Sequence, residues 1–205
     1  MSTPLPAGLD VSCETEARLR HFATLVEKWS RRINLVSPVD LPQIWNRHIL
    51  DSVQLARFAP DPARSWLDLG SGGGFPGLVL AILFREHRPG LAVTLVESDR
   101  RKAAFLHYAA QELGIAPRIL TDRAEELAPQ GADVLSARAL ASLTALLAHA
   151  ARHLAPDGIA VFPKGRNWQA EVDEAHRHWQ FALAIHDSLT DHEARILIAG
   201  GVSRA

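Results

Sequence analysis

The chain has 205 residues, of which 47% are hydrophobic and 22% charged, and its formal net charge is −1. This length predicts one domain or one domain with an extension, and the charge excludes a strongly basic protein that coats nucleic acid. Cys13 is the single cysteine, which excludes an internal disulfide and argues against a cysteine metal site. We therefore expect a protein of a reducing cytoplasm, without a bound metal.

The first sixty residues read as a helical extension to a main domain of residues 61–205. The proline-rich start predicts a loose tail, and residues 1–10 lack the pattern of a signal peptide. Apolar side chains recur at helical spacing over residues 13–32, with Ser12 or Thr15 as the cap, and again over residues 41–58. No apolar run reaches the length that crosses a bilayer, so we expect no membrane association.

From Ser65 onward, short apolar segments typical of strands alternate with longer helical segments. Such alternation predicts an α/β fold in which a mostly parallel sheet is covered by helices on both faces. Because the last two predicted strands follow each other closely, one of them should be antiparallel. The predicted strands are 66–69, 93–97, 118–121, 134–136, 159–163, 181–186 and 196–199, and the predicted helices of this part are 77–85, 100–113, 143–154 and 168–177.

The main domain begins with a strand that runs into the loop Gly70-Ser71-Gly72-Gly73-Gly74. An apolar helix follows, with Pro76 near its first turn, where a missing N–H costs nothing. A strand, a glycine turn and a helix N-terminus together form a cradle for a polar or anionic ligand group. Read from Gly72, the letters also fit G-x-G-x-x-G, the fingerprint of dinucleotide-binding proteins, which alone is a weak signal.

Asp68 separates the two cofactor classes that use such a loop. A carboxylate at this point would repel a pyrophosphate, whereas it would attract the sulfonium and ammonium groups of S-adenosylmethionine. The pattern Asp-x-Gly-x-Gly-x-Gly resembles the first motif of the S-adenosylmethionine-dependent methyltransferases. We therefore expect Asp68, Gly70, Gly72 and Gly74 in the cofactor site. A NAD-dependent oxidoreductase is the alternative that this pattern disfavours.

Three further segments follow predicted strands. Glu97 ends the second strand, where a carboxylate hydrogen-bonds a ribose diol, and Ser98 or Asp99 is the better helix cap. Residues 123–126 follow the third strand, where the adenine lies in this fold, although a solvated acidic helix start fits equally well. Arg138 follows the fourth strand and suits a phosphate or a guanine edge; pairing with Asp68 or Glu97 is the alternative.

Five segments occur in a characteristic order: Asn34-Leu35, Arg47-His48-Ile49-Leu50-Asp51-Ser52, residues 68–77, Ser136-Ala137-Arg138-Ala139 and Pro163-Lys164-Gly165. Together they resemble the RsmG (GidB) family of bacterial 16S ribosomal RNA guanine-N7 methyltransferases, from about Trp29 to Ala199. The run from Arg47 is much more diagnostic than the glycine loop, which many methyltransferases share. One departure is the loop Gly-Ser-Gly-Gly-Gly-Phe, since relatives often carry proline and leucine at its fourth and sixth places.

The resemblance implies a Rossmann-like class I methyltransferase fold with a seven-stranded sheet, and S-adenosyl-L-methionine as the cofactor. It implies a guanine in the decoding-region loop of 16S ribosomal RNA as substrate, free or in a small-subunit assembly particle, and we expect a monomer. It also implies a set of cofactor contacts. These are Gly70, Phe75, Ala124, Glu125 and Arg138.

Methylation of guanine N7 fits the residue types present. The N7 lone pair attacks the methyl group without losing a proton, so no general base is required and Arg138 would act by positioning the substrate. A cysteine nucleophile for pyrimidine C5 methylation is missing, because Cys13 lies in the predicted tail region. A small-molecule methyltransferase and a non-catalytic RNA-binding module stay as alternatives.

Basic residues near the predicted strand ends are the expected RNA contacts, although each one alone is more often a solvated charge. These residues are Arg31, Arg32, Arg47, His48, Arg100, Arg101, Lys102, Lys164 and Arg166.

Overall fold

The computed structural model describes residues 11–205, so the predicted N-terminal tail lies outside the described residues. Its centre is a seven-stranded sheet in the order β3-β2-β1-β4-β5-β7-β6. All pairings are parallel except those of β7, which runs antiparallel to both β5 and β6. This confirms the predicted sheet with one reversed strand. The strands are β1 (Ser65–Leu69), β2 (Ala92–Val96), β3 (Arg118–Leu120), β4 (Ala132–Ala137), β5 (Leu154–Lys164), β6 (Trp179–Asp187) and β7 (Arg195–Arg204).

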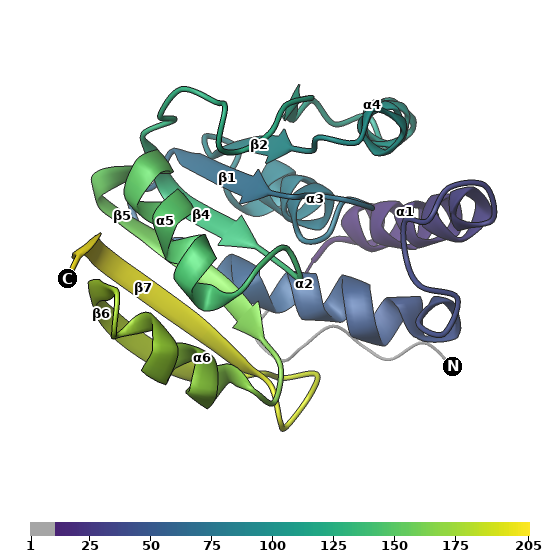
Figure 1. Ribbon diagram of the computed structural model, residues 1–205. Helices are drawn as coiled ribbons and strands as arrows, with labels where there is room; N and C mark the ends of the chain where they lie inside the picture. Colours follow the sequence, from purple (N-terminus) through teal and green to yellow (C-terminus); the bar gives the residue numbers. More distant parts are fainter. Residues whose placement is uncertain (1–10) are drawn as a thin grey trace.

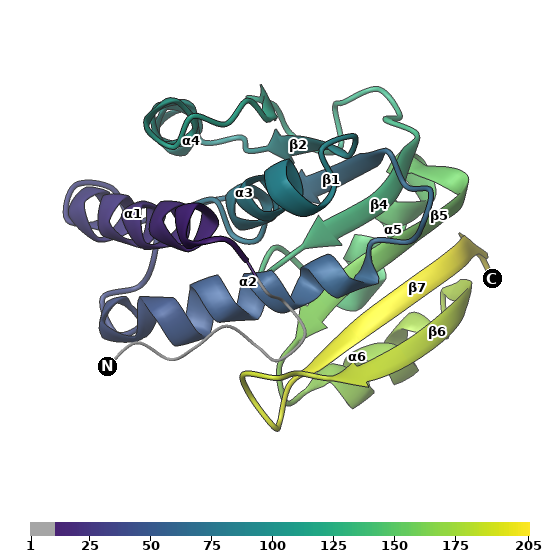
Figure 2. The ribbon, with the colours of Figure 1, turned by 180° about the vertical axis from the view of Figure 1, so that it is seen from behind.

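Helices cover both faces of the sheet, as the alternation predicted. The helices α5 (Leu143–His153) and α6 (Trp168–Ala175) lie in front of it in Figure 1. The helices α1 (Cys13–Ser30) and α3 (Gly77–His87) lie in front in Figure 2, which shows the molecule from behind. The helix α4 (Arg100–Glu112) shares the buried core of α1 and α3.

The alternation of side chains along β1 divides the core into two layers. Trp66 packs with α1, α3 and α4, whereas Leu67 and Leu69 pack with α5 and α6. Asp68 has the same parity as Trp66 and therefore points toward the α3 layer. Because Leu19 of α1 belongs to that same core, α1 is packed into it, and the division of the chain at residue 60 stays a prediction.

Three helices begin with side-chain caps that satisfy free backbone N–H groups. Ser12 accepts a hydrogen bond from the Thr15 N–H, which confirms Ser12 as the cap of α1. Asp99 accepts from the N–H groups of Arg101 and Lys102 at the start of α4, as expected. None of the helices in residues 11–205 combines the length and apolar character needed to cross a membrane.

The prediction of one regular helix over residues 41–58 is wrong, because the segment mixes several kinds of helical turn. The segment coils continuously, but it is built from η1 (Leu41–Gln43), a π-helical turn η2 (Trp45–Leu50), α2 (Asp51–Val53) and the 3-10 helix η3 (Gln54–Phe58). Two of its polar side chains, Asp51 and Gln54, bond to the loop of residues 188–194. Wide π turns of this kind are frequent at functional sites.

Candidate functional site

The glycine loop lies at the carboxyl edge of the sheet, where the strand order switches between β1 and β4. Gly72 has a φ of 53°, a left-handed value that glycine adopts without strain, and a Cβ there would meet only the Gly70 carbonyl oxygen, at 3.7 Å. The Ser71 N–H donates to the Val96 carbonyl oxygen at 3.0 Å, which ties the loop to β2. The backbone at Gly72 therefore stays open to close approach by a ligand.

Asp68 is fully buried beneath this loop. Its Oδ1 accepts a hydrogen bond from Ser136 Oγ at 2.7 Å, and its Oδ2 accepts from Ser71 Oγ at 2.7 Å and from the Gly77 N–H at 3.1 Å. Burial raises the pKa of Asp68 to about 6, against the opposing effect of these hydrogen bonds. The expected negative lining needs a correction: the carboxylate has no exposed surface and shapes the loop from below.

Glu97 holds the other side of the loop. Its Oε2 accepts from the Gly72 N–H at 2.8 Å, and its Oε1 accepts from the Asp99 N–H at 2.8 Å. The side chain is 7% exposed, at the end of β2. One carboxylate thus joins the glycine loop to the start of α4. It is not the helix cap, which is Asp99 as expected, and its role toward a ribose stays a prediction.

The turn after β3 carries Ala124 and Glu125. The carbonyl oxygen of Ala124 accepts a hydrogen bond from Nε2 of His153, a fully buried histidine at the end of α5, at 2.9 Å. Burial lowers the pKa of His153, so the ring is neutral. Glu125 is exposed and lies 3.7 Å from the Arg123 guanidinium. Sequence reasoning missed His153, because only the fold brings it to this turn.

Arg138 joins the segment 41–58 to the strand ends. Its Nη1 donates to the Arg47 carbonyl oxygen at 3.1 Å and lies 3.5 Å from Asp51 Oδ2. Its guanidinium carbon is 5.4 Å from the centre of the Phe75 ring, a cation–π distance. The alternative that Arg138 pairs with Asp68 or Glu97 is therefore wrong, since its carboxylate partner is Asp51. The sequence offered a signal for this Arg138–Asp51 pair, because Asp51 belongs to the run from Arg47 to Ser52 that marks the family.

His48 completes this group. Arg138 Nη2 donates to His48 Nδ1 at 2.6 Å, and because a guanidinium only donates, the hydrogen of the neutral ring lies on Nε2. Burial, and then the charge of Arg138, lower the pKa of His48 to about 4. The ring also lies 5.0 Å from the Phe75 ring, centre to centre. His48 is therefore a neutral group held between Arg138 and Phe75.

A cleft of about 1100 Å³ opens beside Arg138, at the ends of β4 and β5. We call it the strand-end cleft. Asp51 and Gln54 connect one wall of it to the loop between β6 and β7, a connection that sequence reasoning missed. The lining is drawn from residues 40–51, 138–141, 163–165 and 188–196 together with Glu171 of α6, and includes Asp40, Arg47, His48, Asp51, Arg138, Lys164, Leu189, Thr190 and Asp191.

The predicted RNA contacts fall into separate groups. Arg47, His48 and Lys164 line the strand-end cleft with Arg138. Lys164, however, is only 9% exposed, and its ammonium donates to the Ala141 carbonyl oxygen at 2.9 Å and to Glu171 Oε2 at 2.8 Å. Its charge is thus compensated inside the protein in this structure. Arg166 is exposed just beyond β5.

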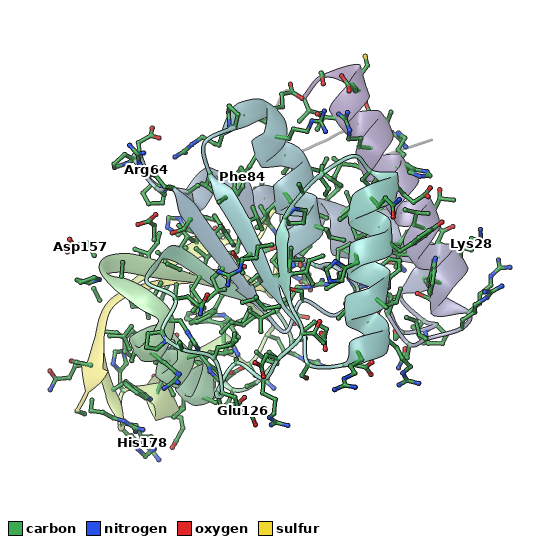
Figure 3. All side chains as sticks on the ribbon, turned by 90° about the horizontal axis from the view of Figure 1, so that it is seen from above. Lys28, Arg64, Phe84, Glu126, Asp157 and His178 are labelled. Carbon is green, nitrogen blue, oxygen red and sulfur yellow. The ribbon has the colours of Figure 1, made fainter. Side chains whose placement is uncertain are left out.

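The other basic residues lie toward the glycine loop. Arg18, early in α1, donates to the Leu113 carbonyl oxygen just after α4, whereas Trp29 near the end of α1 packs on Phe105 and Tyr108. The two helices therefore lie side by side and run antiparallel. Lys28, labelled in Figure 3, marks the end of α1 that lies toward the start of α4. This brings the ends that carry Arg31, Arg32, Arg100, Arg101 and Lys102 to the same side of the molecule.

Comparison with known proteins decides the family. The model of the family rRNA small subunit methyltransferase G matches residues 15–197. The chain belongs to this family. It is 50% identical to the ribosomal RNA small subunit methyltransferase G of Ruegeria pomeroyi over the full length of both chains, and 45% identical to that of Rhizobium meliloti over 96% of this chain and 94% of the relative.

Solved structures agree on the fold at low identity. A SAM-dependent methyltransferase from Aquifex aeolicus aligns with a TM-score of 0.56 and 12% identity, covering 86% of this chain and 96% of its own. The mitomycin 7-O-methyltransferase MmcR aligns with a TM-score of 0.58 and 18% identity, covering 94% of this chain and 68% of its own. The fold is therefore the Rossmann-like methyltransferase fold, and S-adenosylmethionine is the cofactor of the family.

Proposed function

We propose that this member of the rRNA small subunit methyltransferase G family transfers a methyl group from S-adenosylmethionine to N7 of a guanine in the decoding-region loop of 16S ribosomal RNA. The observation that carries the proposal is the set of contacts around Arg138. They join the Arg47-His48 pair, part of the diagnostic run that begins at Arg47, to Phe75 at the end of the glycine loop. Residues of three of the five segments, namely the run from Arg47, the glycine loop and the segment 136–139, thus meet at one edge of the sheet.

The residues at this edge fit the cofactor. The open backbone side of Gly72 leaves room for a ligand group, and Gly70 and Gly74 flank it with left-handed φ values. Glu97 lies where a carboxylate can accept from ribose hydroxyls, and Ala124 and Glu125 lie at the turn that would meet the adenine. When bound, the cofactor supplies an electrophilic methyl group on a positively charged sulfur.

The protein's own contribution is orientation. Guanine N7 presents a lone pair that needs no deprotonation, so holding the base in line accounts for most of the rate enhancement. Arg138 is fixed by His48, Asp51 and the Arg47 carbonyl, and a fixed guanidinium suits a phosphate or the guanine O6. Because His48 is neutral, it adds no second positive charge beside a cationic methyl donor.

Exposed basic residues beside the cofactor edge would hold the RNA backbone. Arg31, Arg32 and Arg101 are exposed, and such contacts position a nucleic acid without reading its sequence. We include the small-subunit assembly particle as an alternative form of the substrate. We also propose that the enzyme acts in the cytoplasm, as a monomer.

Incubation with labelled S-adenosylmethionine and unmodified small-subunit RNA or particles tests the proposal. We expect label at N7 of one guanine in 16S RNA, mapped by strand cleavage at 7-methylguanosine. Arg31→Glu and Arg32→Glu should weaken RNA binding and reduce its salt dependence while donor affinity is kept. Label on a small molecule only, with activity unaffected by these reversals, would support a small-molecule methyltransferase instead and overturn the proposal.

A further inference from the structure

Gln54 is a fully buried amide whose partners come from one distant loop and from Asp51. Its Oε1 accepts from the Leu189 N–H at 2.8 Å, and its Nε2 donates to Asp51 Oδ1 at 2.9 Å and to Ser188 Oγ at 3.2 Å. A buried amide left without partners costs free energy, so these bonds fix the start of the β6–β7 loop. Gln54 thus holds a loop that lies some 135 residues later in the chain.

The same network reaches Arg138. Thr190 Oγ1 donates to Asp51 Oδ1 at 2.9 Å, while Asp51 Oδ2 lies 3.5 Å from Arg138 Nη1. One carboxylate therefore links the β6–β7 loop to the Arg138 guanidinium, and all three line the strand-end cleft. The position of this loop relative to Arg138 is set by side-chain hydrogen bonds and not by the sheet alone.

The carboxylates of the cleft differ in their partners. Asp40 pairs with Arg47, Asp51 with Arg138 and Glu171 with Lys164. Asp191, on the β6–β7 loop, is exposed and is the one cleft carboxylate without a basic partner among residues 11–205. Its Oδ1 accepts from the Glu193 N–H at 3.0 Å, which leaves most of its acceptor capacity open to the cleft.

The strand order fixes where the loop that carries Asp191 lies relative to the glycine loop. From the glycine loop after β1, the sheet passes β4 and β5 before it reaches β7 and the loop before it. At about 4.8 Å per strand, the two loops are separated by about 14 Å along the sheet edge. A guanine between them with N7 toward the glycine loop turns its Watson–Crick edge toward Asp191, and this edge is the one that base-modifying enzymes read.

We propose that Asp191 recognises the guanine by accepting from its N1–H and 2-amino groups, and that Gln54 is a positioning residue that holds the Asp191 loop through Leu189 and Ser188. Guanine presents two adjacent donors on that edge, which a carboxylate accepts together, whereas adenine presents an acceptor at N1. This inference rests on the proposed function, because it assigns the wall of the same site that reads the base.

The test compares RNA carrying guanosine or inosine at the position where the wild-type enzyme places its methyl group. Inosine keeps N7 and N1–H but lacks the 2-amino group. We expect the wild-type kcat/KM to fall by about tenfold or more with inosine, the range of one charge-assisted hydrogen bond, and Asp191→Asn to bring the ratio close to one. Because Asp191 is exposed, this variant keeps its fold, and donor affinity should be unchanged.

Gln54→Leu should lower the guanosine-to-inosine ratio in the same way, with an increased KM for RNA and an unchanged affinity for S-adenosylmethionine. The matched control is Ser65→Ala, which removes the hydroxyl that bonds Asp133 at the opposite edge of the sheet and should leave the ratio intact. If the wild type discriminates and Asp191→Asn discriminates equally, or if the wild type accepts inosine fully, the inference is overturned. If the wild type methylates neither RNA, the proposed function itself fails.

Discussion

Gly77, the first residue of α3, should tolerate no side chain. A Cβ at this position would lie 2.7 Å from Asp68 Oδ2 and 2.7 Å from Leu95 Cδ2. Both neighbours are fully buried and cannot turn away into solvent. Gly77→Ala would therefore push the carboxylate off the Gly77 N–H, to which it is bonded at 3.1 Å, although alanine is the better helix former.

The size of the effect follows from these contacts. Overpacking a core costs about 1–3 kcal/mol, and loss of a hydrogen bond to a charged group costs about 1.5–3 kcal/mol. The higher helix propensity of alanine offsets at most about 1 kcal/mol of this loss in stability. We expect Gly77→Ala to lower the free energy of unfolding by about 1.5–5 kcal/mol.

Urea unfolding followed by tryptophan fluorescence measures this change as a lower midpoint with an unchanged slope. Calorimetry on the folded variant should show about tenfold weaker binding of S-adenosylmethionine, because the loop above Asp68 shifts. Gly90→Ala is the control, since a Cβ there meets nothing within 4 Å. A Gly77→Ala protein with the wild-type midpoint and donor affinity would refute the role assigned to the Asp68–Gly77 bond.

Three further changes follow from buried polar contacts. Ser136→Ala unpairs an indole N–H and one oxygen of Asp68, and should lower the free energy of unfolding by about 2–4 kcal/mol in urea titrations. His153→Leu leaves the Ala124 carbonyl unsatisfied, and should weaken donor binding in calorimetry while the KM for RNA stays unchanged. The pKa of His48 is about 4 when folded, against 6.5 when unfolded, so the unfolded state binds more protons between these values. Stability should fall as pH drops through that window, and the urea midpoint of His48→Asn should fall less between pH 7 and 4.5.

The architecture could be predicted because its signals are local. Each strand of the sheet is a short apolar run, and the glycine loop marks the turn after the first of them. The cap at Asp99 also depends only on nearby residues, because its side chain accepts from the N–H groups two and three positions further on. Alternation of strands and helices then leaves few arrangements of the sheet, and the observed order is one of them.

The features that the sequence predicts wrongly, or does not predict, depend on contacts between residues far apart in the chain. Apolar spacing predicts a regular helix over residues 41–58, but Gln54 and Asp51 bond a loop some 135 residues away, and no periodicity reveals that. The sequence also shows that Asp68 is acidic without showing that it is buried, since its partner Ser136 is 68 residues further on. The sequence likewise shows that Lys164 is basic, but only the fold shows that its ammonium is paired with Glu171.

Three carboxylates at the sheet edge have the same structural role: their oxygens accept hydrogen bonds that hold neighbouring segments in place. Asp68 accepts from the backbone N–H of Gly77 at the start of α3, and Glu97 accepts from the N–H groups of Gly72 in the glycine loop and Asp99 after β2. Asp51 likewise binds Arg138 and Thr190. In the proposed function, the charge of Asp68 and Glu97 would attract the sulfonium of S-adenosylmethionine through space, because such attraction persists over several ångströms in a protein. Because the Asp68–Gly77 bond supports both the fold and the glycine loop of the proposed donor site, Gly77→Ala should lower the free energy of unfolding and the affinity for S-adenosylmethionine. The Asp191 carboxylate lies outside this group, so its replacement should change the choice of base alone.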